Sequence, residues 1–547
     1  MVKGAGKPYF LGGTNQESGA IQSRKVEQMT WKDEVEELHK RKKLSYRMGG
    51  EENVKKQHDL GKMTARERIE VFLDPNSFLE RGVLSGEATY KKNEITSFTP
   101  CPILIGLGTV NGNKIVLSAD DFTIKGASVG DMYKAKMAYA TKMAHELRIP
   151  MVRLLDGAGG TIKEILKFGY VKFPTLPDHA MKDLVNIMSM VPIVSIALGP
   201  TAGSGGLLMV SSHFSVMVKE KSQVFVGGPA LVKQAFGHNV TKAELGGYKI
   251  HTRISGVVDN VAESEQDAFQ QAKQFLEYMP SNVWEMPKRK YQELDDTQRR
   301  EEKLLSIIPR DPRKSYDMRH ILALIFDRDS LFEIGQYCGR AQITALARLN
   351  GYPVGILAND SKFWAGSFGW DVAEKFQRFV DMCDAFHLPI VNFVDQPGFR
   401  IGKEAEEHGT IRKGVRAVFS VYQATIPYMA IYVRKAYGVA GGSQEDYSGL
   451  NWRYFWPSAN WGNIVVEGGV YAAHRAEIEA SQDPEALLND LEEKYRAFGS
   501  PFRSAEAFDI EDVIDPRDTR PLLCHWIEMG YRVEQRRLGM KARGIRC

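Results

Sequence analysis

The chain has 547 residues, 43% of them hydrophobic and 26% charged, and this length exceeds what one hydrophobic core normally supports, so we expect two domains. Its 72 basic and 68 acidic side chains leave a net charge of +4, which argues against a nucleic-acid partner and against a polybasic membrane surface. The five cysteines form no CxxC pair, and no apolar stretch reaches 18 residues. The sequence therefore predicts a protein of the reducing cytoplasm without a metal site, a disulfide framework or membrane insertion.

Strands, helices and glycine turns alternate through the first half of the chain. A turn at Gly112, in VNGNKIVLSADD, precedes a helical stretch that ends in HELRIP, and the strand MVRLL follows. Next come the glycine turn Gly157–Gly160, the helix-like TIKEILKF, the strand Ile193–Leu198 and a second glycine turn, Gly199–Gly206. This order predicts βαβ units with a largely parallel sheet and a ligand site at the strand carboxyl ends.

The second half repeats this order, through LNGYPVGILAND, CDAFHLPIVNFVDQPGF and IPYMAIYVRKAYGVAGG. Gly112, Pro150 and Asp156 recur 239 positions later as Gly351, Pro389 and Asp395, and the segment from Val191 recurs 235 positions later from Ile426. We therefore predict an α/β fold of two tandem domains related by internal duplication, in residues 1–290 and 315–547. The charged, proline-punctuated segment Trp284–Ser315 separates them.

The glycine turns are the main chemical feature. A glycine turn that opens a helix exposes backbone N–H groups and the positive end of the helix dipole, which can hold a phosphate or the oxyanion of an enolate or tetrahedral intermediate. A single such turn is more often a tight turn without a ligand, but four equivalent turns in a duplicated frame favour a binding role.

Other catalytic motifs are absent or weak. The sequence has no GxxxxGK[ST] and no HExxH, and the GxSxG match at Gly126–Gly130 follows ADDFTIK instead of a hydrophobic strand. We expect Asp120, Asp121, Asp156 and Asp395 to cap turns or helices. Backbone donors without an obvious catalytic side chain suit reactions that stabilise a thioester enolate.

From about Trp31 to its C-terminus, the chain carries seven blocks in order: GKMTARERIEVFLD, VTKAELGGYKIHTRISGVVD, CDAFHLPIVNFVDQPGF, GTIRKG, VRKAYG, YFWPSA and DVIDPRDTR. In these blocks it resembles the carboxyltransferase (beta) subunits of biotin-dependent acyl-CoA carboxylases of the propionyl-CoA and methylcrotonyl-CoA type, and the related glutaconyl-CoA decarboxylase subunit. The resemblance implies two crotonase-like (ClpP/crotonase) domains. It also implies transfer of CO₂ from carboxybiotin to the α carbon, or the vinylogous γ carbon, of an acyl-CoA through an enolate.

The resemblance also implies the site residues. It places the thioester-side oxyanion hole on the amides of Gly159 and Gly160, beside Ala158, and the biotin-side hole on Val439 and Ala440. It assigns Gly203 and Gly205 to the loop that supports the coenzyme A thioester and Lys136 to the neighbourhood of coenzyme A, although a solvated lysine is an equal alternative. The remaining positions of the biotin-side turn are Gly438, Gly441 and Gly442.

No Ala-Met-Lys-Met biotinylation signature occurs, so the resemblance implies that a partner, a biotin carboxylase or biotin carboxyl carrier subunit, holds the biotin. Coenzyme A enters as part of the substrate. The resemblance further implies a homo-oligomer, either a dimer or a hexamer built as a trimer of dimers. In it, the N-domain of one chain and the C-domain of another close one active site.

Several positions depart from the family pattern. Gly442 stands where propionyl-type relatives have an Asp, Thr161 stands where many have an Arg, and aromatic residues crowd nearby segments at Trp364, Phe368, Trp370, Trp452 and Trp461. One hypothesis is an acyl group larger or more polar than propionyl, such as an aromatic one. The alternative is that these aromatic side chains pack a core or an oligomer interface.

Three other functions stay open. An acyl-CoA decarboxylase would run the same chemistry in reverse. A biotin-independent hydratase or hydrolase would need an acid–base carboxylate, for which Glu164 is the candidate. A non-catalytic scaffold would explain the altered Val439–Gly442 loop.

Overall fold

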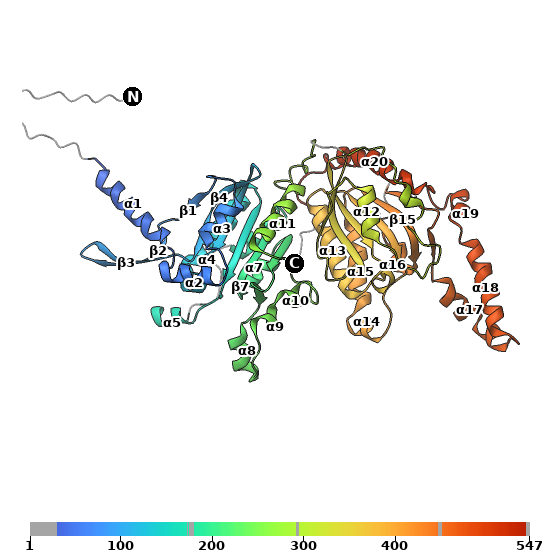
Figure 1. Ribbon diagram of the computed structural model, residues 1–547, viewed down its shortest axis with the longest axis horizontal. Helices are drawn as coiled ribbons and strands as arrows, with labels where there is room; N and C mark the ends of the chain where they lie inside the picture. Colours follow the sequence, from blue (N-terminus) through green and yellow to red (C-terminus); the bar gives the residue numbers. More distant parts are fainter. Residues whose placement is uncertain (1–29, 172, 174–179, 292–294, 447–450, 543–547) are drawn as a thin grey trace, which may run out of the picture.

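Two mixed sheets, one in each half of the chain, organise the computed structural model, which describes residues 30–171, 173, 180–291, 295–446 and 451–542 (Figure 1). The first sheet has the order β1-β4-β5-β6-β7-β8-β10, with β9 paired to β7. Its strands are β1 (Leu79–Arg81), β4 (Ile103–Val110), β5 (Asn113–Asp120), β6 (Met151–Gly157), β7 (Ile193–Ala202), β8 (Phe214–Val218), β9 (Gln223–Phe225) and β10 (Asn260–Ala262). A separate hairpin joins β2 (Gly86–Lys91) and β3 (Glu94–Pro100).

The second sheet has the order β11-β12-β13-β14-β15-β16, with β17 paired to β15. Its strands are β11 (Phe332–Glu333), β12 (Gln342–Leu349), β13 (Tyr352–Asn359), β14 (Ile390–Gln396), β15 (Tyr428–Tyr437), β16 (Trp452–Phe455) and β17 (Asn460–Gly462). In both sheets the strands that precede the glycine turns run parallel to each other, as the βαβ alternation predicted.

Helices surround both sheets. The N-terminal half contains α1 (Lys32–Tyr46), α2 (Glu51–Asp59), α3 (Ala65–Phe72), α4 (Asp131–Leu147), α5 (Lys163–Phe168), α6 (Ala180–Ile187), α7 (Ser204–Val210), α8 (Pro229–Phe236), α9 (Lys242–Gly246), α10 (Tyr248–His251) and α11 (Glu265–Tyr278). The C-terminal half contains α12 (Met318–Ile325), α13 (Trp370–Ala385), α14 (Lys403–Glu407), α15 (Thr410–Gln423), α16 (Gly438–Gly442), α17 (Val466–Ala480), α18 (Pro484–Phe498), α19 (Pro501–Glu506) and α20 (Thr519–Glu534). Single 3₁₀ turns span Lys125–Ala127, Glu302–Leu305, Trp364–Gly366 and Pro516–Asp518.

Local sequence explains these helices. Thr64 begins α3 with a capping box: its side chain accepts from the Glu67 amide, while Glu67 accepts from the Thr64 amide. Helix α4 buries Tyr133, Met137, Ala140 and Ala144, a spacing of three and four that places them on one face. No helix in the described part of the chain combines the length and the apolar character needed to cross a bilayer.

The internal duplication is confirmed at the level of single residue pairs. Val116 pairs with Met151 in the first sheet, and Gly355 pairs with Ile390 in the second, so both partners move by 239 positions. Met151 pairs with Ile193, and Ile390 pairs with Tyr428, which reproduces the change of offset from 239 to 235. The first sheet uses strands from residues 79–262 and the second from 332–462, while the domain limits at 290 and 315 stay predictions.

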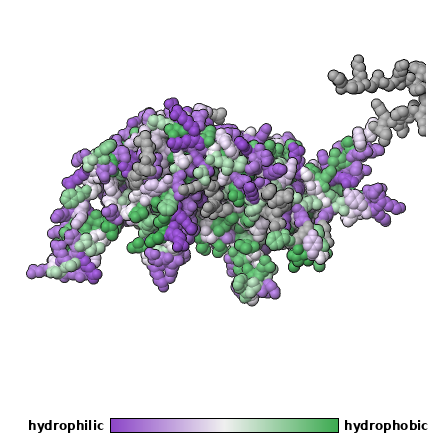
Figure 2. Space-filling view, turned by 180° about the vertical axis from the view of Figure 1, so that it is seen from behind, coloured by the Kyte–Doolittle hydropathy of each residue, from purple (hydrophilic) through white to green (hydrophobic). Residues whose placement is uncertain are grey.

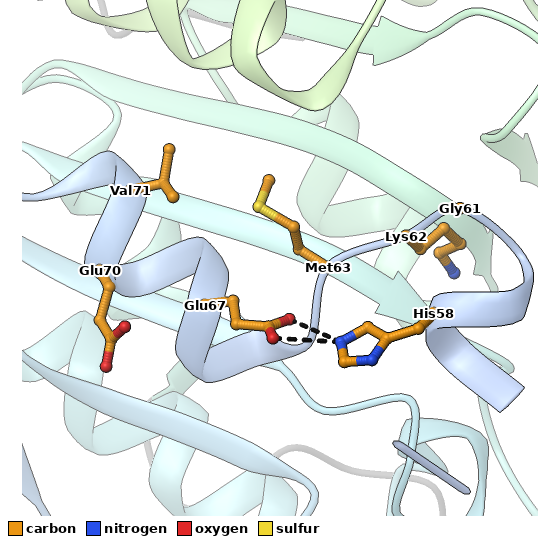
Figure 3. Close-up of a pocket in the computed structure, with 7 residues that line it drawn as sticks. All are labelled: His58, Gly61, Lys62, Met63, Glu67, Glu70 and Val71. Atoms are coloured by element: carbon orange, nitrogen blue, oxygen red, sulfur yellow. Dashed lines mark hydrogen bonds and ion pairs between the residues drawn. The ribbon is translucent and has the colours of Figure 1, made fainter. Parts of the chain in front are cut away.

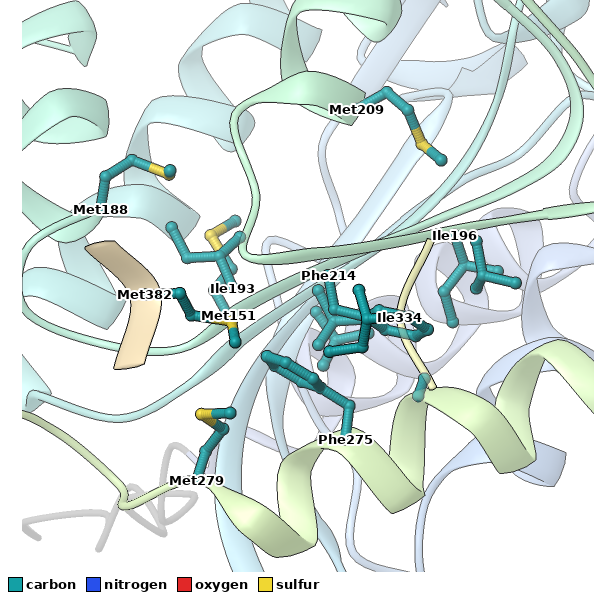
Figure 4. Close-up of a cluster of buried hydrophobic side chains, with 14 of the residues drawn as sticks. Met151, Met188, Ile193, Ile196, Met209, Phe214, Phe275, Met279, Ile334 and Met382 are labelled. Carbon is teal, nitrogen blue, oxygen red and sulfur yellow. The ribbon is translucent and has the colours of Figure 1, made fainter. Parts of the chain in front are cut away.

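The two halves share a continuous apolar core. Met151, Ile193 and Phe214 of the first sheet lie beside Phe275 of α11 and Met382 of α13, together with further methionine and isoleucine side chains (Figure 4). Polar contacts reinforce this packing. The guanidinium of Arg378, on α13, pairs with the Asp259 carboxylate, and the His387 ring contacts the Val283 carbonyl oxygen at 2.7 Å. The two halves therefore stand side by side as one packed body (Figure 1).

Candidate active site

The predicted N-domain site residues meet at the carboxyl ends of β6 and β7. Ala158 donates its amide to the Gly126 carbonyl at 2.9 Å, and a Cβ on Gly159 would lie 3.0 Å from the Ala202 carbonyl oxygen. Gly203 follows β7 directly and caps α7, and Gly205 lies in the first turn of that helix. The structure thus brings Ala158, Gly159, Gly160, Gly203 and Gly205 to one edge of the sheet.

Gly160 presents a backbone donor at this edge. It pairs with Val129 in an isolated bridge in which the Val129 amide donates to the Gly159 carbonyl at 2.9 Å. Because such a bridge uses the backbone groups on either side of Gly160, the amide of Gly160 itself points away from it. Gly159 has a φ of +84°, a conformation that strongly favours glycine. A backbone donor at such a glycine turn is chemically able to hold an anion.

The second turn differs from its prediction. Gly199–Ala202, expected to be part of a glycine turn, instead continue strand β7 because β9 pairs with Pro200, Thr201 and Ala202. The turn therefore begins only at Gly203, where φ is +59°. The amides of Ser204 and Gly205 open α7, where helical amides have no acceptor within their own helix.

The C-domain repeats this turn between β15 and α16. Gly438 has a φ of +62°, Val439 is 65% exposed, and Ala440 is buried. A Cβ on Gly441 would lie 2.4 Å from the Ala436 carbonyl carbon, whereas a Cβ on Gly442 would meet nothing within 4 Å. Subtracting the offset of 235 from Val439 and Ala440 gives Ser204 and Gly205, so the biotin-side turn is equivalent to the turn after β7 and not to Gly159 and Gly160.

Two buried aspartates, Asp156 and Asp395, form ion pairs beside the turns, instead of the turn or helix caps that the sequence suggested. In the N-domain, Asp156 Oδ2 accepts from Lys62 Nζ at 2.6 Å and from Arg68 Nη1 at 2.9 Å, and the Asp156 amide donates to Asp120 Oδ2 at 3.1 Å. Burial raises the pKa of Asp120 to about 7, and the Tyr133 hydroxyl donates to Asp120 Oδ1 at 2.7 Å. These carboxylates are structural anchors of the strand that leads into the turn.

The C-domain anchors its aspartate with different residues. Arg434 Nη2 donates to Asp395 Oδ2 at 2.9 Å, and the Lys435 amide donates to Oδ1 at 3.1 Å. Gly199 and Pro200 occupy the positions 235 residues earlier. Neither has a cationic side chain, and Pro200 has no N–H. A Cβ on Gly199 would lie 1.9 Å from Asp156 Oδ1. The N-domain therefore takes its cations, Lys62 and Arg68, from the segment of α2 and α3.

Lys62 also borders an open hollow of about 430 Å³ on the N-domain surface (Figure 3). His58 and Glu67 both line it and point toward each other, with His58 Nε2 3.0 Å from Glu67 Oε2. The sequence did not predict that Lys62 and Arg68 support the site, although both lie in the family block GKMTARERIEVFLD. The internal repeat carried a signal for them. It aligns Arg434 and Lys435, which bind Asp395, with Gly199 and Pro200, so Asp156 has to take its cations from another segment.

Lys136 lies inside the domain. Its ammonium is buried, donates to the Gly82 carbonyl at 3.3 Å, and has its pKa lowered by burial. Lys375, 239 positions later, similarly donates to the Gly335 carbonyl at 2.8 Å. A structural reason thus exists for a lysine at both positions, and the contact of Lys136 with coenzyme A stays a prediction.

The other residues that the sequence singled out are a serine, a glutamate and several aromatic residues. The Ser128 hydroxyl of the GxSxG match donates to the Lys125 carbonyl at 2.6 Å, which fits a turn. The side chain of Glu164 lies outside the described residues. Phe368 is buried, and Trp452 and Trp461 pack against hydrophobic clusters, whereas Trp364 is 65% exposed. Among the described residues, no group of three or more His, Cys, Asp and Glu side chains is placed to hold a metal ion.

Comparisons with known proteins show the family to which the chain belongs. The carboxyl transferase domain family matches residues 56–545. The chain is 34% identical to the propionyl-CoA carboxylase carboxyltransferase subunit of Haloferax mediterranei, over 92% of this chain and 96% of the relative. It is also 34% identical to methylmalonyl-CoA decarboxylase subunit alpha of Veillonella parvula, over 91% of this chain and 96% of that one. The crystal structure of transcarboxylase 12S, a hexamer with methylmalonyl-CoA bound, matches with a TM-score of 0.84 at 31% identity, covering 95% of this chain and 99% of that chain. The chain therefore belongs to the carboxyl transferase family and is a carboxyltransferase of the biotin-dependent acyl-CoA carboxylase type.

Proposed function

We propose that the chain adds CO₂, delivered as carboxybiotin on a partner subunit, to the α carbon or the vinylogous γ carbon of an acyl-CoA. The observation that carries this proposal is the duplicated pair of glycine turns, which present backbone donors while the adjacent carboxylates, Asp156 and Asp395, are held in buried ion pairs. Such donors stabilise the oxyanion of a thioester enolate. Biotin supplies the base and the CO₂ when bound, and the chain supplies position and electrostatics.

The partner can be tested directly. Purification of the chain from its native cells, followed by probing with labelled streptavidin, should reveal a biotinylated protein in stoichiometric amount. If no biotinylated protein co-purifies and acyl-CoA still binds, the chemistry is independent of biotin. The four described cysteines are free thiols, which supports a reducing cytoplasm as its location.

We place the thioester-side hole on Gly160, with Gly159 and Ala158 shaping the turn. The internal symmetry supports Ser204 and Gly205 as the competing site. Gly160→Pro removes the N–H, and Gly160→Ala is the matched control because a Cβ on Gly160 would meet nothing within 4 Å. Ser204 is the first residue of α7, where proline is tolerated, and Ser204→Ala is its control.

The two proline variants decide between the turns. Loss of one oxyanion donor costs about 10²–10³ in kcat. We expect that loss in Gly160→Pro and activity near wild type in Ser204→Pro, with both alanine controls active. The reverse result would move the hole to the start of α7. An active Gly160→Pro together with an active Ser204→Pro would refute both assignments.

The biotin side fits the turn at Gly438–Gly442. Gly442 leaves open space, and Val439 lies in the first turn of α16, where a proline costs no helical hydrogen bond. Val439→Pro and Ala440→Pro should therefore block transfer from the biotinylated partner and spare acyl-CoA binding, with Val439→Ala as the control. Unchanged transfer in both proline variants would relocate the biotin site.

The surface supports a homo-oligomer. Exposed apolar side chains gather along the edge that carries the turns: Ile162, Leu166, Leu231 and Phe236 in the N-domain, and Ile401, Ile411, Phe419 and Val439 in the C-domain. Figure 2 shows hydrophobic surface on this projecting edge of the N-domain. We infer that the N-domain of one copy packs on the C-domain of another, as a dimer or a hexamer. Sedimentation of Phe419→Asp should show smaller particles, and an unchanged mass would contradict this interface.

The size of the acyl group that the site accepts depends on the space around Gly442. Open space at Gly442 supports a substrate larger or more polar than propionyl-CoA. A panel of acyl-CoA substrates in which acetyl-CoA or propionyl-CoA reacts best would refute this. The decarboxylating Veillonella parvula relative supports the reverse reaction as a second candidate. Biotin-dependent release of CO₂ from a carboxylated acyl-CoA, without net carboxylation, would favour it.

A further inference from the structure

An aromatic stack flanks the biotin-side turn of the C-domain. The guanidinium carbon of Arg400 lies 4.7 Å from the ring centre of Trp364 and 5.0 Å from that of Trp370. The Trp370 ring stacks in turn on His408, with ring centres 4.2 Å apart and planes 15° apart. These pairwise contacts link four side chains in the order Trp364, Arg400, Trp370 and His408, which we name the Trp364 column.

The chain makes specific room for this column. A Cβ on Gly369 would lie 2.6 Å from the Arg400 guanidinium carbon, so a larger residue there would require the arginine to shift. Asp371 Oδ1 lies 3.3 Å from Arg400 Nη2, and the arginine side chain is 9% exposed. Arg400 is therefore a mostly buried cation that lies against the Trp364 indole.

Trp364 is exposed despite this support. Its side chain is 65% accessible and its φ is +50°, a backbone conformation that a bulky residue rarely adopts. Lys125, 239 positions earlier, has the same conformation with a φ of +52°, so the turn belongs to the duplicated frame and only the side chain differs. With its inner face on Arg400, Trp364 leaves its outer face available to a ligand.

The column is connected to the biotin-side turn. Phe368 and Phe399 adjoin it in sequence, and they lie close to Ala440 and Gln444. Arg400 also donates its amide to the Phe368 carbonyl at 3.0 Å, which ties the loop after β14 to the start of α13. A ring stacked on Trp364 would therefore lie at the margin of the site that Val439 and Ala440 define.

We propose that the outer face of Trp364 is a stacking platform for the planar ureido ring of the biotin that the partner subunit carries. The proposal rests on the proposed function, because it deepens the biotin side of the same site. The ligand class follows from the contrast within the duplicated frame: the N-domain, which takes the polyanionic coenzyme A ester, has a lysine at this turn, and the C-domain has a flat apolar face. The cation behind the indole draws electron density from that face, which favours a carboxylated, anionic ring.

The test uses the complete enzyme with its biotinylated partner. Trp364→Ala should raise the apparent KM for the biotinylated partner roughly 10-fold and leave the KM for acyl-CoA unchanged. Trp364→Phe should keep most of the wild-type value because it keeps a flat face. Trp31→Ala, which removes an indole that is 77% exposed on α1, is the control and should change neither constant.

The possible results separate cleanly. An unchanged KM for the partner in Trp364→Ala overturns the platform, and so does a rise confined to acyl-CoA, which would assign Trp364 to the acyl group. Saturation-transfer NMR with biotin methyl ester isolates the ring from the carrier protein. Loss of that signal in Trp364→Ala supports the stacking, and an unchanged signal overturns it in favour of a carrier-protein contact. If wild-type enzyme transfers nothing from a biotinylated partner, the proposed function itself fails.

Discussion

Substituting Lys62 by methionine tests how the N-domain supports its glycine turn. The Lys62 ammonium lies 2.6 Å from Asp156 Oδ2, with side chains 5% and 0% exposed. Methionine keeps the length and the apolar stem of lysine but removes the charge, so the change isolates the ion pair. The lost ion pair involves Asp156, the β6 residue that directly precedes Gly157–Gly160.

The expected cost follows from burial. Removing one partner of a buried ion pair costs about 3–5 kcal/mol when the other charge is left uncompensated. Arg68 still contacts the same oxygen at 2.9 Å, so we expect the lower end, about 3 kcal/mol of unfolding free energy. Loss of the Lys62 contact over the Phe122 ring, at 4.8 Å, acts in the same direction. We also expect kcat to fall about tenfold, because the glycine turn loses a fixed anchor.

Urea denaturation and steady-state kinetics measure the two effects. The matched control is Lys125→Met, which breaks the exposed Lys125–Glu87 pair, with side chains 60% and 52% exposed, and should cost less than about 1 kcal/mol. Amide exchange at Ala158, which donates to the Gly126 carbonyl, should accelerate in Lys62→Met. If Lys62→Met and Lys125→Met lose equal stability and exchange equally, the buried pair does not anchor the turn.

Three further variants probe the same framework. Gly199→Ala should fail to fold or lose more than about 3 kcal/mol, because its Cβ would lie 1.9 Å from Asp156 Oδ1; soluble, fully active protein would contradict that geometry. Burial raises the pKa of Glu445 to about 8, so its protonated form stabilises the fold, and this contribution to stability should fall as the pH rises from about 4.5 to about 8. In urea titrations at several pH values, Glu445→Gln should lose less stability over that range than the wild type, and an identical pH profile in the two proteins would refute the assignment. Gly442→Asp has open space and should fold normally while shifting the acyl preference toward smaller groups; an unchanged substrate profile would separate Gly442 from acyl selection.

Features that depend on local pattern were predictable from the sequence. Gly112 and Asp156 recur as Gly351 and Asp395. This repeat predicted two domains in which equivalent strands pair at equivalent positions. The glycine turns after β6 and β15 lie where a strand meets a helix, as expected. Backbone geometry at Gly159 and Gly438, with positive φ, agrees with the choice of glycine at those positions.

Features that depend on distant segments were not predictable in the same way. Gly199–Ala202 read as a turn because glycine and proline stand there, but pairing with β9 overrides this local signal. Arg68 reaches Asp156 across 88 positions and Glu265 across 197, so periodicity carries no information about either contact. The Trp364 column likewise joins residues that no local pattern relates.

The unequal anchoring of Asp156 and Asp395 has a consequence for the order in which the chain folds. Arg434 closes a loop of 39 residues onto Asp395, whereas Arg68 must close loops of 88 and 197 residues onto its two carboxylates. Because long loops lose more entropy on closure, contacts of short sequence separation form earlier and with a lower barrier. We expect the turn after β15 to form first during refolding, and the turn after β6 to wait for the amino-terminal helices to dock.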